Sequence, residues 1–172
     1  MPGAADFSLA DLYAALDVER QTRGITWRQM MQEINAVGRW HIHPISDSTV
    51  RSLRTKAVGE GDGILQMLRW LKRAPESFVP GCNRAAAHAM KLPDVPAHEI
   101  LRFDTRRLYQ ALDAQRTARH LTWQEVAQEI GRLTSVSLTN LKKGGRVAFP
   151  QVVWMTRWLD RPVADFVRAS PL

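Results

Sequence analysis

The feature that most constrains this chain is an internal duplication. Leu12–Ile34 aligns with Leu108–Ile130 at an offset of 96 residues, and 12 of the 23 paired positions are identical. Further along the chain the offset falls to 88, where Trp70 pairs with Trp158 and Phe78 with Phe166. A repeat of this kind predicts two copies of one small domain rather than a single large domain.

The change of offset places eight extra residues in the first copy, between Asn35 and Thr49. A stretch between the copies matches neither of them and is rich in proline, which is typical of a linker. The expected organisation is therefore a first domain over residues 1–79 with an enlarged turn at 35–49, a linker over 80–101, and a second domain over 102–172.

In the second copy, local signals predict the first two helices. Asp104 is a good N-cap for the first. Thr122 and Glu125 form a capping box, in which each side chain satisfies a backbone donor at the start of the second helix. Gly131 suits the left-handed residue that ends it. These signals indicate a helix, a turn and a second helix in quick succession.

A short third helix is expected next, capped by Ser135 or Ser137, with Leu138 and Leu141 on its inner face. Two prolines then begin a fourth and a brief fifth helix, namely Pro150 and Pro162. Each copy should thus hold roughly five helices, with no sheet beyond a possible wing in the enlarged turn.

The string LTWQEVAQEIG, residues 121–131, followed by SLTNLKKG, residues 137–144, resembles the phage-repressor-like, or Xre-type, helix-turn-helix family. The resemblance extends to both copies. It implies an all-α chain of two tandem lambda-repressor-like five-helix domains joined by a linker, each with its third helix in the DNA major groove. In that family a phosphate-contacting glutamine usually follows the capping threonine, whereas this chain has Trp27 and Trp123 there.

Helical periodicity selects the residues that would face DNA. With Leu138 and Leu141 inward, the outer surface of the third helix carries hydroxyl and amide groups, and a basic cluster follows it. Asn140 can pair bidentately with adenine, while the cations suit backbone phosphates. The candidates in the second copy are Ser135, Ser137, Thr139, Asn140, Lys142, Lys143 and Arg146.

The third helix of the first copy is expected from about Ser48 to Lys56, with Val50 and Leu53 inward. Its arginines are suited to reading guanine. The enlarged turn is either a wing that touches DNA or a partner, or a sign that this copy no longer reads bases. The candidates in the first copy are Thr49, Arg51, Ser52, Arg54, Thr55 and Lys56.

Charge favours a polyanionic partner. The formal net charge is +7; residues 1–80 hold 10 basic and 9 acidic side chains, and residues 81–172 hold 14 and 8. The second copy should therefore supply most of the attraction to nucleic acid. No secretory signal or apolar membrane segment is found, and a lone cysteine, Cys82, fits a reducing cytoplasm.

Other chemistry is not expected. The recurring pairs Asp17/Asp113 and Glu33/Glu129 should be caps or ion-pair partners, because no nucleophile, phosphate loop or metal set accompanies them. His41-Ile42-His43 lacks further ligands, so neither a metal nor another cofactor is predicted, and the chain is not expected to be an enzyme.

Two hypotheses follow. The leading one is a cytoplasmic, bacterial or phage transcription regulator that binds specific double-stranded DNA. The alternative is a protein-interaction module, such as an antitoxin or adaptor, in which one repeat holds a protein partner; a homodimer is also left open. Steep salt dependence of duplex binding would distinguish the first from the second.

Overall fold

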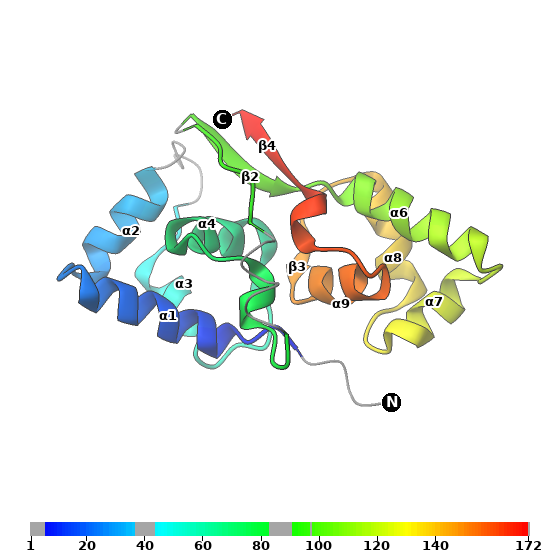
Figure 1. Cartoon of the computed structure of the whole chain (residues 1–172), viewed down its shortest axis with the longest axis horizontal. Coiled ribbons are helices and arrows are strands. Elements are labelled where there is room, and N and C mark those ends of the chain that lie inside the picture. Colours follow the sequence, from blue (N-terminus) through cyan, green and yellow to red (C-terminus); the bar gives the residue numbers. More distant parts are fainter. Residues whose placement is uncertain (1–5, 37–43, 83–90, 97, 172) are drawn as a thin grey trace.

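The computed structural model describes residues 6–36, 44–82, 91–96 and 98–171. The two copies lie side by side along the long axis of the molecule (Figure 1). The first copy contains α1 (Leu9–Thr22), α2 (Trp27–Ala36), α3 (Asp47–Ser52), α4 (Gly61–Leu71) and the 3-10 helix η1 (Pro75–Phe78). The second contains α6 (Thr105–Ala118), α7 (Trp123–Ile130), α8 (Ser135–Asn140), η2 (Leu141–Lys143), α9 (Gln151–Trp158) and η3 (Val163–Phe166).

The helix starts follow the sequence repeat. Ser8 and Asp104, 96 residues apart, cap α1 and α6, and each backbone N–H donates at 2.8 Å to the last residue of the same copy's 3-10 helix. Ser46 and Thr134, 88 residues apart, cap α3 and α8. The eight extra residues therefore lie between α2 and α3. Because Thr134 caps α8, the prediction of Ser135 or Ser137 as its cap was wrong.

The prediction of an all-α chain was wrong. Two antiparallel ribbons join distant segments: β1 (Gly59–Glu60) pairs with β3 (Ala148–Phe149), and β2 (Glu99–Phe103) pairs with β4 (Val167–Pro171). The last helix of each copy, η1 or η3, is a 3-10 helix rather than an α-helix. The arrangement is thus mixed, not two five-helix domains. Strands of two residues, such as β1 and β3, are too short to show alternation of apolar and polar side chains. Each strand also pairs with a segment far away in the sequence, which local patterns do not predict.

The short β1–β3 ribbon lies between the copies and relates them by an approximate two-fold axis. Glu60 faces Ala148, and these residues are equivalent in the repeat at the offset of 88. On either side, Gly59 faces Phe149, while the Gly61 N–H donates to the carbonyl of Val147 at 3.0 Å. Equivalent residues of the two copies therefore meet across an antiparallel pair.

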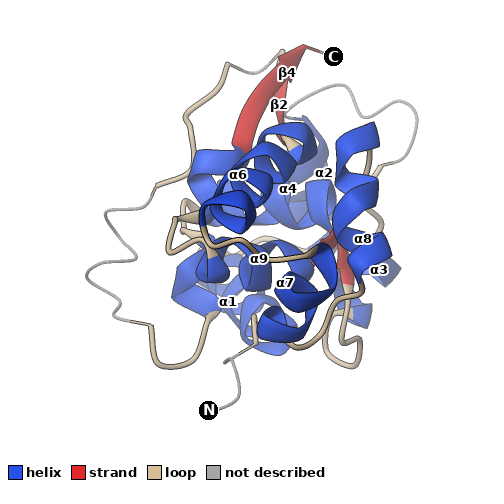
Figure 2. Cartoon of the chain, turned by 90° about the vertical axis from the view of Figure 1, so that its right-hand side faces the viewer, coloured by secondary structure: helices blue, strands red, loops and turns tan. Residues whose placement is uncertain are grey.

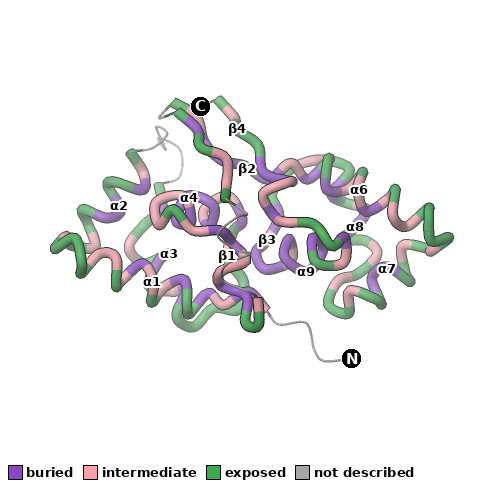
Figure 3. The backbone as a smooth tube through the Cα atoms, in the orientation of Figure 1, coloured by how far each residue is buried: buried purple, intermediate pink, exposed green. Residues whose placement is uncertain are grey.

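The copies share one core (Figure 3). Phe149 is fully buried, with ring centroids 4.6 Å from Phe7 and 5.5 Å from Phe103, which are equivalent residues of the two copies. Across the same junction the Gln66 side chain donates to the Leu101 carbonyl at 2.9 Å. Leu101 comes from the segment predicted as a linker, whose last three residues begin β2.

Candidate nucleic-acid interface

The α7–turn–α8 unit of the second copy is built from strong local signals. Thr122 and Glu125 form the predicted capping box, with backbone-to-side-chain distances of 2.7 and 3.2 Å. Gly131 ends α7 at φ 84°, a left-handed conformation that glycine adopts without a steric penalty. Leu138 and Leu141 are buried as predicted. The inner face of α8 is thereby fixed, and its opposite face lies outside the core.

The outer face of α8 presents polar side chains, one of which has no partner among the described residues. Asn140 is exposed, and its side chain has no hydrogen bond within the described ranges. Thr139 donates to the Val136 carbonyl at 3.2 Å, and Ser137 contacts the cap Thr134 at 2.9 Å. Ser135 is half-buried at the first position. Three exposed cations follow the helix: Lys142, Lys143 and Arg146.

Sequence reasoning missed Val136 on this helix. It is 63% exposed, between two polar neighbours. The signal was present in the sequence, because Val136 lies off the inward stripe that Leu138 and Leu141 define. An exposed methyl-bearing side chain beside Asn140 and Thr139 is suited to contact with the thymine methyl group.

In the first copy, two hydrogen bonds join the end of α2 to the segment before α3. They hold α3 in the position that α8 has in the second copy, despite the eight inserted residues. The Asn35 side chain donates to the Ile45 carbonyl at 2.8 Å and accepts from the Ile45 N–H at 2.9 Å. Val50 and Leu53 are buried as predicted. The helix itself spans Asp47–Ser52, so the prediction that it extends to Lys56 was wrong. The wing proposed for the enlarged turn at 35–49 falls partly at 37–43, outside the described residues, and the described part of the turn contains no strand.

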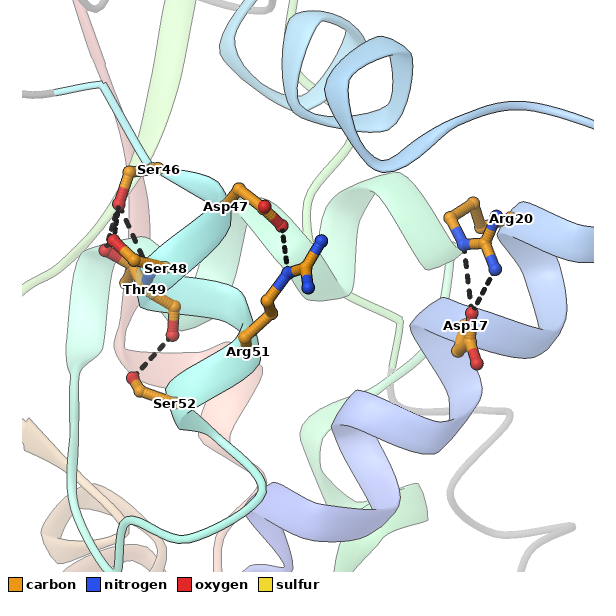
Figure 4. Close-up of polar contacts among 8 residues, drawn as sticks. All are labelled: Asp17, Arg20, Ser46, Asp47, Ser48, Thr49, Arg51 and Ser52. Atoms are coloured by element: carbon orange, nitrogen blue, oxygen red, sulfur yellow. Dashed lines mark hydrogen bonds and ion pairs between the residues drawn. The ribbon is translucent and has the colours of Figure 1, made fainter.

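The outer groups of α3 are largely tied to one another (Figure 4). Arg51 donates to Asp47 at 2.9 Å, and this contact raises the pKa of the arginine. The Ser52 hydroxyl donates to the Thr49 carbonyl at 2.7 Å, and the Thr49 hydroxyl lies 2.9 Å from that of Ser46. Such internal partners compete with any base or phosphate.

The remaining candidates of the first copy follow α3. Arg54 lies over the Tyr13 ring at 5.6 Å, and Thr55 makes a long contact of 3.4 Å to the Ser52 carbonyl. Lys56 is exposed. Aromatic stacking holds the Arg54 guanidinium against the scaffold while leaving it at the surface.

The residues that recur in both copies hold the scaffold. Arg20 and Arg116 each bridge a carboxylate on their own helix, Asp17 and Asp113, to the carbonyl before the capping threonine. The Arg20 contact lowers the pKa of Asp17. Each tryptophan after the capping threonine stacks on a tyrosine, at 5.4 Å in the first copy and 5.2 Å in the second. These tryptophans therefore have packing partners.

A second network recurs at the end of each copy. The Trp158 and Trp70 side chains each donate at 2.8 Å to a glutamate, Glu129 and Glu33 respectively. Arg119 pairs with Glu129 through two contacts of 2.7 and 2.8 Å and lowers its pKa. The corresponding pair in the first copy is longer, at 3.3 Å. The predicted ion-pair role of the recurring acidic residues is confirmed.

A basic cleft of about 570 Å³ opens where the copies meet. It is lined by five cations, of which sequence reasoning selected only Lys143 and Arg146. The other three are Arg102 on β2, Arg106 on α6 and Arg168 on β4. Arg102 and Arg168 face one another in the β2–β4 register. No local pattern predicts this grouping, because it depends on strand pairing between distant segments.

Two carboxylates also line the cleft. Asp104 caps α6 by accepting from the Arg107 N–H at 3.0 Å, and Asp62 accepts from the Phe103 N–H at 3.2 Å. Burial raises the pKa of Asp62, against the opposing effect of that backbone hydrogen bond. Both carboxylates accept a backbone hydrogen bond, and the nearby Arg102 and Arg146 also act to lower the pKa of Asp62, without forming an ion pair with it in the described residues.

No family model, curated protein or solved structure matches this chain. Among the described residues, no helix is long and apolar enough to cross a membrane. The described residues also contain no cluster of three or more side chains suited to a metal ion. The His41-Ile42-His43 segment lies outside the described residues.

Proposed function

We propose that this chain binds specific sites in double-stranded DNA, with α8 as the principal reading helix and α3 as a secondary one. The observation that carries the proposal is the outer face of α8, a short helix after a tight turn. It presents Asn140, which has no partner among the described residues, and three exposed cations follow it. Asn140 would contact a base edge, and Lys142, Lys143 and Arg146 would contact phosphates.

Both reading helices are available to one duplex. In Figure 2, α3 and α8 lie toward the same edge of the molecule, and the approximate two-fold axis at Glu60 and Ala148 passes between the copies. A single chain would then do what a dimer of single domains does. We expect two related but unlike half-sites, centred about 34 Å or a multiple apart.

The test is selection of bound sequences from random duplexes, followed by footprinting of the selected site by the full-length chain. The expected result is an enriched bipartite site whose affinity falls steeply with salt. Protection of only one short half-site would contradict the use of both helices. Absence of duplex binding at low ionic strength would contradict the proposed function and favour a protein partner. Control of transcription would follow from a site that overlaps a promoter.

A further inference from the structure

The described arginines differ in whether they have a carboxylate partner. Seven of them form ion pairs with carboxylates, and these support the helices and the junction: Arg20, Arg23, Arg51, Arg116, Arg119, Arg132 and Arg161. In the part of the chain that the structure describes, none of the five cations of the basic cleft forms such a pair. Asp62 and Asp104 also line the hollow, but the five cations outnumber these two carboxylates. The excess positive charge repels itself, and an anion relieves this repulsion.

The cleft continues toward the first copy. A neighbouring hollow of about 340 Å³ shares Asp62, Arg102 and Arg146 with it and reaches Thr49 and Ser52 on α3. The cleft itself includes Lys143 in η2, directly after α8. One groove therefore runs across the junction from the first reading helix to the end of the second.

The basic cleft belongs to one side of the two-fold axis only. The positions of the first copy equivalent to its five cations carry no positive charge: Asp6, Ala10, Thr55, Val58 and Pro80. Because the scaffold repeats while this cluster does not, the cluster is not needed to hold a copy together. Its location beside η2 associates it with the half-site read by α8.

We propose that the basic cleft holds the sugar–phosphate backbone in the middle of the bound site, on the half read by α8. This inference rests on the proposed function. The phosphodiester backbone matches the cleft because it offers a regular row of single negative charges, and guanidinium groups bind phosphate oxygens in a bidentate manner. Contact there is independent of base sequence, so the cleft adds affinity and positions the reading helices without adding specificity.

The test uses Arg102→Ala and Arg106→Ala in the full-length chain, with Lys91→Ala as the matched control. Lys91 is an exposed cation that lies outside the cleft. Each cleft variant should weaken binding to selected and random duplexes by the same factor and flatten the salt dependence by about one unit of slope. Lys91→Ala should leave the slope unchanged. Thermal unfolding of each variant checks that the fold is kept.

Phosphate ethylation locates the contact on the DNA. Ethylated phosphates between the two half-sites, toward the one read by α8, should impair binding of the wild-type chain, and Arg102→Ala should remove this interference. Interference confined to the outer flanks, or cleft variants whose salt slope equals that of Lys91→Ala, would overturn the inference while leaving the proposed function standing. A wild-type chain that binds no duplex would overturn both.

Discussion

The helices α3 and α8, proposed to read DNA, share one scaffold and differ in the polar groups that they expose. On α3, the Arg51 guanidinium is paired with Asp47 and the Ser52 hydroxyl is donated to the Thr49 carbonyl. At the positions equivalent to Arg51 and Ser52, α8 carries Thr139 and Asn140. The asparagine is exposed and has no partner in the described chain. The polar side chains of α3 therefore have partners within that helix, whereas the amide of Asn140 on α8 has none among the described residues.

This contrast shows how a duplicated domain diverges. The residues common to both copies make the same contacts twice, as in the Tyr13–Trp27 and Tyr109–Trp123 stacks. The outer faces differ, as Arg51 and Ser52 correspond to Thr139 and Asn140, and buried positions such as Met30 and Val126 differ in size. A side chain that holds the scaffold cannot change without loss of stability, whereas an exposed one is free to acquire a partner.

The largest expected effect concerns the shared core. Phe149→Ala should lower the free energy of unfolding by about 3–5 kcal/mol, because it leaves a cavity between Phe7 and Phe103. Urea denaturation measures this loss. Both copies should unfold in one transition that moves as a whole. Two separate transitions, of which only the second shifts, would show that the copies are independent.

The residue of the first copy equivalent to Phe149 is Gly61. There, an added side-chain atom should destabilise the fold by crowding, whereas Phe149→Ala destabilises it by leaving a cavity. A methyl group there would lie 2.5 Å from the Val147 carbonyl oxygen and 2.9 Å from the Phe103 ring. Gly61→Ala should therefore cost about 1–3 kcal/mol of unfolding free energy. Gly63→Ala is the control, since its nearest neighbour is the flexible Glu60 side chain at 3.3 Å. Equal effects of the two substitutions would contradict close packing at the two-fold axis.

A matched pair of variants compares the reading helices directly. Asn140→Ala should cost about 1–3 kcal/mol on the selected site and relax base preference at one position. Ser52→Ala, at the equivalent position, should cost less, because that hydroxyl already has a backbone partner. Binding constants on the selected site and on single-base variants measure both. If Ser52→Ala relaxes specificity and Asn140→Ala does not, the principal reading helix is α3.

The smallest expected effect concerns how stability depends on pH through Glu76. The equivalent residue of the second copy is Ala164, which does not titrate. Burial raises the pKa of Glu76, although its carboxylate accepts from the Val163 N–H at 2.7 Å. With a raised pKa in the folded state, the contribution of Glu76 to stability should increase as pH falls through that raised pKa toward the ordinary pKa of glutamate. Glu76→Gln removes this titration.

The difference in unfolding free energy between Glu76→Gln and wild type should therefore shift in favour of wild type on acidification. Denaturation at several pH values measures it, with Asp160→Asn, an exposed substitution, as the control. A difference that stays constant with pH would show that Glu76 titrates alike in the folded and unfolded chains.

The sequence by itself determined the duplication, most helix starts and the inward stripes. The capping box of Thr122 and Glu125, the left-handed Gly131 and the buried Leu138 were all predicted from neighbouring residues. Such features depend on hydrogen bonds and periodicity within a few residues, so a short window contains the whole signal. The same windows placed Asn140 on the outer face of α8.

Only the tertiary structure decided the rest. The strand pairs join Glu60 to Ala148 and Arg102 to Arg168, and no local window contains both partners of either pair. The grouping of Lys143 with Arg102, Arg106 and Arg168 is of the same kind, whereas the Arg51–Asp47 pair joins residues four apart on one helix and lies within a local window. The junction and its basic cleft were therefore invisible in the sequence, because a contact between distant residues is fixed by how whole copies pack rather than by the residues beside it.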